Sequence, residues 1–139
     1  MGVANAIIFC NIGAAYGTAK AAIGVGNLGL IAPTKIFKAL VPIIMAGILG
    51  IYGLIAGVLI SQKASPGLKE GDGYKYFFAG LTVGGSSLAS GYAIGIAGEA
   101  WVKAYSQTEK SFVGMILVMI FAEAIGLYGL IIGLIIATS

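Results

Sequence analysis

Long runs without a charged side chain dominate the sequence. Three runs carry no charge and a fourth carries a single acid, and they lie at residues 1–19, 39–62, 76–98 and 111–139. A membrane-spanning helix needs about 20 mostly apolar residues. The pattern therefore predicts four transmembrane helices, near residues 3–27, 38–61, 76–103 and 110–137. The alternation of period 2 that marks transmembrane barrel strands is not sustained.

One internal segment is clearly polar. Residues 62–73 (QKASPGLKEGDG) combine mixed charges with glycine and proline, which favours a loop. This segment divides the chain into a first helical hairpin, residues 1–61, and a second hairpin, residues 74–139. Each hairpin needs a turn, which we place near Asn27–Thr34 and Tyr105–Lys110. We expect an all-α membrane protein built from two transmembrane hairpins.

The two hairpins resemble each other. Ile44–Ile60 (IMAGILGIYGLIAGVLI) and Ile120–Ile136 (IFAEAIGLYGLIIGLII) are identical at nine of 17 positions when offset by 76 residues. The first helices of the hairpins match more weakly, at an offset of 74. A duplicated hairpin explains the repeat. Because both copies begin and end on the same side of the membrane, they should be parallel repeats, related by an axis along the membrane normal.

Small residues recur every fourth position in the first and third predicted helices. The glycines that we select as helix-packing positions are Gly13, Gly17, Gly91 and Gly95. Small residues allow helices to approach closely in lipid, where apolar burial supplies no drive for association. Two interpretations remain open. These glycines pack the four helices of one chain against each other, or they line the inner wall of a ring of many copies.

Composition excludes several classes of function. Charged residues make up only 9% of the 139 residues, against roughly 25% in a soluble domain. The chain has no histidine and one cysteine, so it holds neither a His/Cys zinc site nor a catalytic Ser-His or Cys-His pair. No phosphate-binding G-x-x-x-x-G-K-[ST] motif is present. We therefore expect no cofactor, no metal, no nucleic-acid partner and no enzymatic chemistry by this chain alone.

Glu123 is the only acid near the middle of a predicted transmembrane helix. A charged group at that depth costs about 2.5–3.5 kcal/mol on insertion scales. We therefore expect the carboxyl group to be neutral in the membrane and to serve a function. Its aligned position in the first hairpin is Gly47, so each chain carries one such site. Tyr128 lies one turn and a residue beyond Glu123, and it either shapes the surroundings of the carboxyl group or merely packs.

Other polar residues have simpler interpretations. Glu99 and Glu109, near the second turn, are expected to be solvated. Four hydroxyl residues of the third helix are expected to bond back to carbonyls of their own helix, namely Thr82, Ser86, Ser87 and Ser90. Four lysines lie near the hairpin turns and three near the central loop. That small excess favours a cytoplasmic location for the turns.

Four stretches resemble a known family. They are GAAYGTAK (Gly13–Lys20), VPIIMAGILGIYGLI (Val41–Ile55), ASGYAIGIAGE (Ala89–Glu99) and FVGMILVMIFAEAIGLYGLI (Phe112–Ile131). The chain resembles the c-type proteolipids of V-type (vacuolar) proton ATPases over nearly its whole length. The resemblance implies a four-helix protein that assembles with other c-type subunits into a ring in the lipid bilayer of vacuolar or other endomembranes.

The same resemblance implies a mechanism. Such rings turn against the a-subunit of the stator, driven by ATP hydrolysis in a separate soluble sector, and they contact a central stalk that includes the d-subunit. The proton-carrying Glu of the family falls on Glu123. It should be protonated where it faces lipid and should ionise beside an Arg of the stator. Macrolide inhibitors of the family bind near this acid, which would involve Tyr128 and the environment that includes Gly47.

Apart from the resemblance, the residues leave three alternatives to a proton-carrying ring subunit. Sodium transport would need further oxygen ligands, and no Gln or Asp accompanies Glu123 in the membrane, so protons are favoured. A small multidrug/proton secondary transporter could also use one buried acid. In a structural channel protein, Glu123 would be incidental.

Overall fold

The computed structural model describes residues 1–63 and 70–139, and within these ranges the backbone is helical apart from short turns. The elements in chain order are α1 (Gly2–Ile31), the 3-10 turn η1 (Pro33–Lys35), α2 (Ile36–Ala39), α3 (Val41–Lys63), α4 (Glu70–Gln107) and α5 (Ser111–Thr138). The described residues contain no strand. The predicted all-α class is confirmed.

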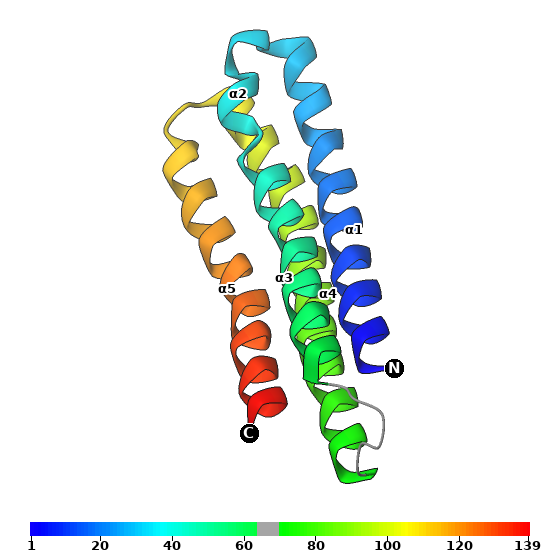
Figure 1. Ribbon diagram of the computed structural model, residues 1–139. Coiled ribbons are helices and arrows are strands. Elements are labelled where there is room, and N and C mark those ends of the chain that lie inside the picture. The colour runs from blue at the N-terminus through cyan, green and yellow to red at the C-terminus, as the bar shows by residue number, and fades with distance from the viewer. Residues whose placement is uncertain (64–69) are drawn as a thin grey trace.

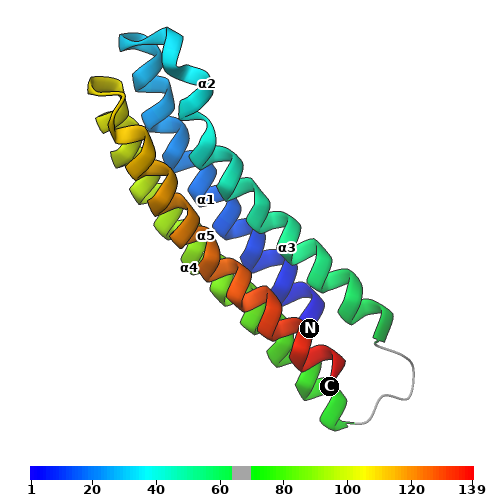
Figure 2. The same ribbon diagram turned by 90° about the vertical axis from the view of Figure 1, so that its left-hand side faces the viewer.

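The four long helices lie side by side in an elongated bundle (Figure 1). α1 and α4 run in one direction, and α3 and α5 run in the other. Both hairpin turns therefore lie at the same end of the bundle, and Figure 2 shows the same arrangement from the side. α4 packs along α1 and α5, while α3 packs along α1 and also contacts α4 and α5. The hairpins are parallel, as the repeat predicts.

The first turn comes later in the chain than the sequence predicts. α1 continues to Ile31, where the N–H of Ala32 bonds to the carbonyl of Leu28 at 2.7 Å. The helix stops there because Pro33 disfavours helical geometry at the residue before it, and Ala32 is not helical, with φ of −139° and ψ of 73°. The predicted second helix, 38–61, is divided into α2 and α3. Pro42 is tolerated in the first turn of α3 because its missing N–H would have no helical partner.

Helix also covers both edges of the segment predicted as the polar loop, residues 62–73. α3 continues to Lys63 and α4 begins at Glu70. The middle of that predicted loop, residues 64–69, lies outside the described residues.

Three helical segments are long and apolar enough to cross a membrane: Gly2–Ile31, Pro33–Lys63 and Ser111–Thr138. The helix α4, which contains the predicted span 76–103, is not among them. Many of its residues are glycine and serine, which are less apolar than the leucine and isoleucine of α5. Its position alongside α1 and α5 favours the same membrane depth, and its role as a fourth spanning helix stays a prediction.

The four glycines selected from the sequence lie where α1 meets α4. A Cβ added to Gly17 would lie 2.9 Å from the carbonyl oxygen of Gly91, and one added to Gly95 would lie 3.1 Å from the Cα of Gly17. A Cβ on Gly13 would lie 2.9 Å from the Cα of Leu88. These are backbone-to-backbone contacts within one chain. These glycines therefore pack α1 against α4 within the chain, and a place on the inner wall of a ring stays a prediction.

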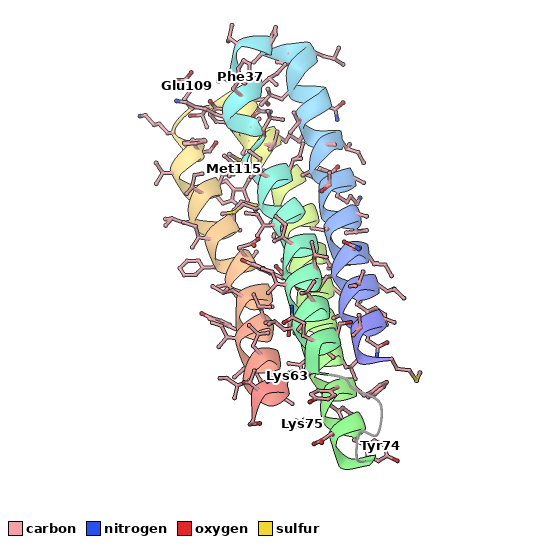
Figure 3. All side chains as sticks on the ribbon, viewed as in Figure 1. Phe37, Lys63, Tyr74, Lys75, Glu109 and Met115 are labelled. Atoms are coloured by element: carbon pink, nitrogen blue, oxygen red, sulfur yellow. The ribbon has the colours of Figure 1, made fainter. Side chains whose placement is uncertain are left out.

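The two hairpins are joined at their turns. Lys35 Nζ donates to the carbonyl oxygen of Tyr105 at 3.3 Å and lies 5.2 Å from the centre of the Tyr105 ring. Tyr105 is in the last turn of α4, where carbonyl groups have no helical partner and a cation is favourable. Figure 3 shows Phe37 and Glu109 at this end of the bundle. The first turn thus caps the third long helix.

Candidate functional site

Glu123 points into the bundle. Its exposed fraction is 9%, whereas Phe121 and Tyr128 on the same helix are 71% and 64% exposed. The carboxyl group therefore lies on the face of α5 that packs against α3 and α4, and the neighbouring aromatic rings cover the outer face. In the described chain the side chain thus faces α3 and α4, whereas the family resemblance implies a stage of the cycle in which it faces lipid.

Tyr52 of α3 lies close to the Glu123 carboxyl group. The tyrosine is partly buried and packs against the core cluster that includes Leu49 and Ala122. The contact falls short of a full hydrogen bond, because both carboxyl oxygens remain without a hydrogen-bond partner among the described residues. The acid and the phenol thus face each other across the two hairpins, one from each.

Ser90 of α4 approaches the same place through the backbone. Its hydroxyl donates to the carbonyl oxygen of Ala122 at 2.6 Å, and the serine is fully buried. Gly126, one turn further along α5, allows this approach. A Cβ there would lie 2.7 Å from Leu49 Cδ2 and 3.4 Å from Ser90 Cβ. Leu49, Ser90 and Gly126 therefore fix the spacing of α3, α4 and α5 around the acid.

No cation pairs with Glu123 within the described part of the chain. The ion pairs found there join Lys20 to Glu99 at 3.5 Å and Lys75 to Asp72 at 4.0 Å. No three His, Cys, Asp or Glu side chains among the described residues are grouped as a metal site. A buried carboxylate without a cation or a metal is costly, so burial favours the neutral acid in this position.

Tyr128 and Gly47, the two residues predicted in the environment of the acid, are both exposed. Tyr128 is on the exposed face of α5. Gly47 is exposed on α3, and a Cβ placed there would meet nothing within 4 Å. Both positions therefore face outward in the described chain, and their part in an inhibitor site stays a prediction.

Sequence reasoning missed Tyr52 as a partner of Glu123, although a signal was present. Tyr52 is the counterpart of Tyr128 in the repeated Tyr-Gly-Leu-Ile segment. Of the two equivalent tyrosines, the one on the other hairpin meets the acid. The role of Ser90 was also misjudged. Thr82 does bond to its own helix, at the carbonyl of Phe78 (2.7 Å), but Ser90 bonds across to α5.

Lys20 and Glu99 form a half-exposed ion pair between α1 and α4. The sequence predicts a solvated Glu99 and assigns it no partner. The pairing arises because α1 and α4 lie in register, which brings position 20 beside position 99. Glu109, in contrast, is exposed as expected.

Comparisons with known proteins agree with the motifs. The family model of the ATP synthase C-subunit matches residues 1–60 and 77–136, one segment in each hairpin, and the two segments begin 76 residues apart. This spacing equals the offset of the internal repeat.

Curated relatives match the whole chain. It is 49% identical over 142 residues to the 16 kDa proteolipid c-subunit of the V-type proton ATPase of Ascaris suum, and the match covers 88% of that relative. It is 47% identical over 139 residues to the proteolipid of the same name from Bos taurus, with 90% of that relative covered. A 16 kDa proteolipid of the V-type proton ATPase of Caenorhabditis elegans is also 49% identical. The resemblance to V-type proteolipids is confirmed, and the chain belongs to the ATP synthase C-subunit family.

Proposed function

We propose that this chain is a proton-carrying proteolipid in the membrane sector of a V-type ATPase, and that Glu123 carries the proton. One observation supports the proposal above the others. The acid is buried in a mostly apolar helix, and neither carboxyl oxygen has a hydrogen-bond partner among the described residues. Relatives at 47–49% identity over the full chain are named as V-type proton ATPase proteolipids.

The burial explains how a proton is kept. An ionised carboxylate loses its hydration in the bundle and finds no cation from the described residues to replace it. Glu123 therefore retains its proton while the ring carries it through lipid. Release requires a positive charge from outside this chain. A basic residue of the stator, an Arg of its a-subunit by family resemblance, would supply that charge.

Release also requires movement. Because Glu123 is only 9% exposed, its side chain must swing past the outer face of α5 to meet the stator. In the proposed cycle, the acid swings outward, loses its proton beside the stator cation, is reprotonated from a second half-channel and folds inward again. Tyr52 lies where it can receive the returning carboxyl group.

The proposed partners follow from the family. Copies of this chain, or of related c-type subunits, form a ring that turns against the a-subunit of the stator and contacts the d-subunit of the central stalk. The hairpin turns face the cytoplasm, and the membrane is vacuolar or another endomembrane. This chain does not hydrolyse ATP. Moving one charge across 100 mV takes about 2.3 kcal/mol, which hydrolysis in a separate sector supplies.

Replacement of the acid by its amide tests the proposal. Glu123→Gln should abolish ATP-driven acidification of vesicles while the ring still assembles, because the amide keeps the shape but has no exchangeable acid proton. Glu109→Gln is the matched control, since Glu109 is exposed at the second turn, and it should pump normally. Normal acidification by vesicles that contain only Glu123→Gln would refute the proposed function.

A second measurement separates a rotary ring from an independent transporter or channel. A hydrophobic carbodiimide should modify the protonated Glu123 from the lipid phase. One modified copy should stop a whole ring, because every acid must pass the same stator. Inhibition should therefore run well ahead of the fraction of Glu123 labelled. Proportional loss of transport and labelling would favour the multidrug/proton transporter or the channel.

A further inference from the structure

The hydrogen bond from Ser90 to α5 stands apart from the other hydroxyl contacts of the bundle. Thr82, Ser106 and Thr138 each bond to a carbonyl three or four residues earlier in their own helix. Ser90 instead crosses to another helix, 32 residues away in sequence, and it is fully buried. We propose that Ser90 is a positioning residue for proton exchange, which anchors the backbone of Glu123 to α4. This inference rests on the proposed function of Glu123.

The Ala122 carbonyl oxygen, to which Ser90 bonds, is linked directly to the backbone of Glu123. The carbonyl of Ala122 and the N–H of Glu123 belong to one planar peptide unit. A bond of 2.6 Å to that carbonyl therefore holds the unit from which the Glu123 Cα projects. The same carbonyl accepts the N–H of Gly126 in the helix, and its second lone pair remains available for Ser90.

Packing around this peptide leaves little room for another arrangement. Gly126, Gly129 and Gly133 form a glycine row on the side of α5 that meets α4. A Cβ at Gly129 would lie 3.0 Å from the carbonyl oxygen of Thr82, and one at Gly133 would lie 3.0 Å from that of Ala79. Because α4 and α5 are this close and Ser90 holds one peptide of α5, rotation of the whole of α5 would break the Ser90 bond and disrupt the packing. Proton exchange at Glu123 then proceeds by rotation of its side chain on a fixed backbone.

Ser87 provides a matched comparison on the same helix. It lies one turn before Ser90 and is equally buried, but its hydroxyl has no hydrogen-bond partner among the described residues. Ser87→Ala and Ser90→Ala therefore remove the same atom from two equally buried positions of α4, the first beside Gly13 of α1 and the second beside α5. Only Ser90→Ala removes a bond to the peptide that carries Glu123.

The experiment measures labelling of Glu123 by a hydrophobic carbodiimide in the assembled membrane protein, read by mass spectrometry of the Glu123 peptide, with no pumping required. Ser90→Ala should speed labelling by about 2- to 10-fold, the range expected for losing one ordinary hydrogen bond that holds the peptide unit of the acid against α4. Ser87→Ala should stay within about twofold of the unmodified protein. Ser90→Cys should be intermediate, since a thiol donates weakly to a helix carbonyl, as Cys10 does to Val83 at 3.6 Å.

Each outcome bears on the proposal. Equal rates for Ser90→Ala, Ser87→Ala and the unmodified protein would overturn the anchor while leaving the proposed function intact. So would equal effects of Ser90→Ala and Ser87→Ala, which would indicate general loosening of α4. If Ser90→Ala does not assemble, the Ser90→Cys rate decides, because a rate equal to that of the unmodified protein would also overturn the anchor. Normal pumping by Glu123→Gln would refute the proposed function by a separate measurement.

Discussion

Gly17 offers a direct test of helix packing in this bundle. It lies where α1 meets two other helices at once. A Cβ added there would lie 2.8 Å from the Cβ of Ala46 on α3 and 2.9 Å from the carbonyl oxygen of Gly91 on α4. Gly17→Ala therefore adds a methyl group that is too close to both α3 and α4. A shift of α1 away from only one of these helices does not relieve both contacts.

The loss of unfolding free energy expected for Gly17→Ala follows from these distances. Carbon atoms in contact prefer separations of about 3.5–4.0 Å, so α1 must move outward by roughly 1 Å along part of its length. Overpacking of this kind costs about 1–3 kcal/mol. The intrinsic preference of alanine over glycine in a helix returns about 1 kcal/mol. We therefore expect a net loss of about 0–2 kcal/mol in the free energy of unfolding. Gly17→Leu should lose more and should also disrupt ring assembly.

Gly26 on the same helix is the matched control, because an added Cβ there meets nothing within 4 Å. Gly26→Ala should be neutral or stabilising. The assay is the unfolding midpoint in a detergent titration followed by helical circular dichroism, together with native gels for assembly. If Gly17→Ala proves as stable as Gly26→Ala, the close contact of α1 with α3 and α4 is not as described.

Two further predictions concern side chains that join the hairpins. Tyr52→Phe removes the hydroxyl that faces Glu123 and should lower ATP-driven acidification by about 2- to 10-fold, whereas Tyr128→Phe should leave it unchanged; equal effects would contradict the pairing of Tyr52 with the acid. Lys35→Met removes the bond to the Tyr105 carbonyl and should lower the unfolding free energy by about 1 kcal/mol in the same detergent titration, and an unchanged midpoint would show that the cap contributes nothing.

The number of long helices, the parallel hairpins and the importance of Glu123 could be predicted from the sequence. The thickness of a bilayer sets the length of an apolar run, so the runs predicted four long helices whatever their packing. The repeat appeared because equivalent positions in the hairpins kept the same residues, and it predicted parallel hairpins. Glu123 was recognisable because an acid is costly at membrane depth. These inferences depend on composition and spacing along the chain, which tertiary contacts do not change.

Helix boundaries were less predictable. The first turn was placed at Asn27–Thr34, but α1 continues to Ile31 and short helical segments follow. Glycine and asparagine weaken a helix only slightly, and contacts with α4 outweigh that preference. The pyrrolidine ring of Pro33 blocks helical geometry at Ala32 regardless of packing, so the observed end of α1 lies there.

Only the tertiary structure decided which way the acid faces and what meets it. The helix α5 has apolar side chains on every face, and lipid solvates an apolar face as well as a protein core does. The sequence of such a helix therefore carries little contrast between inside and outside. The choice depends on shape: the glycines of α5 admit α4 closely, Ser90 reaches the Ala122 carbonyl, and Tyr52 rather than Tyr128 lies beside Glu123. Close packing between helices, which no periodicity along one helix encodes, determined the surroundings of Glu123.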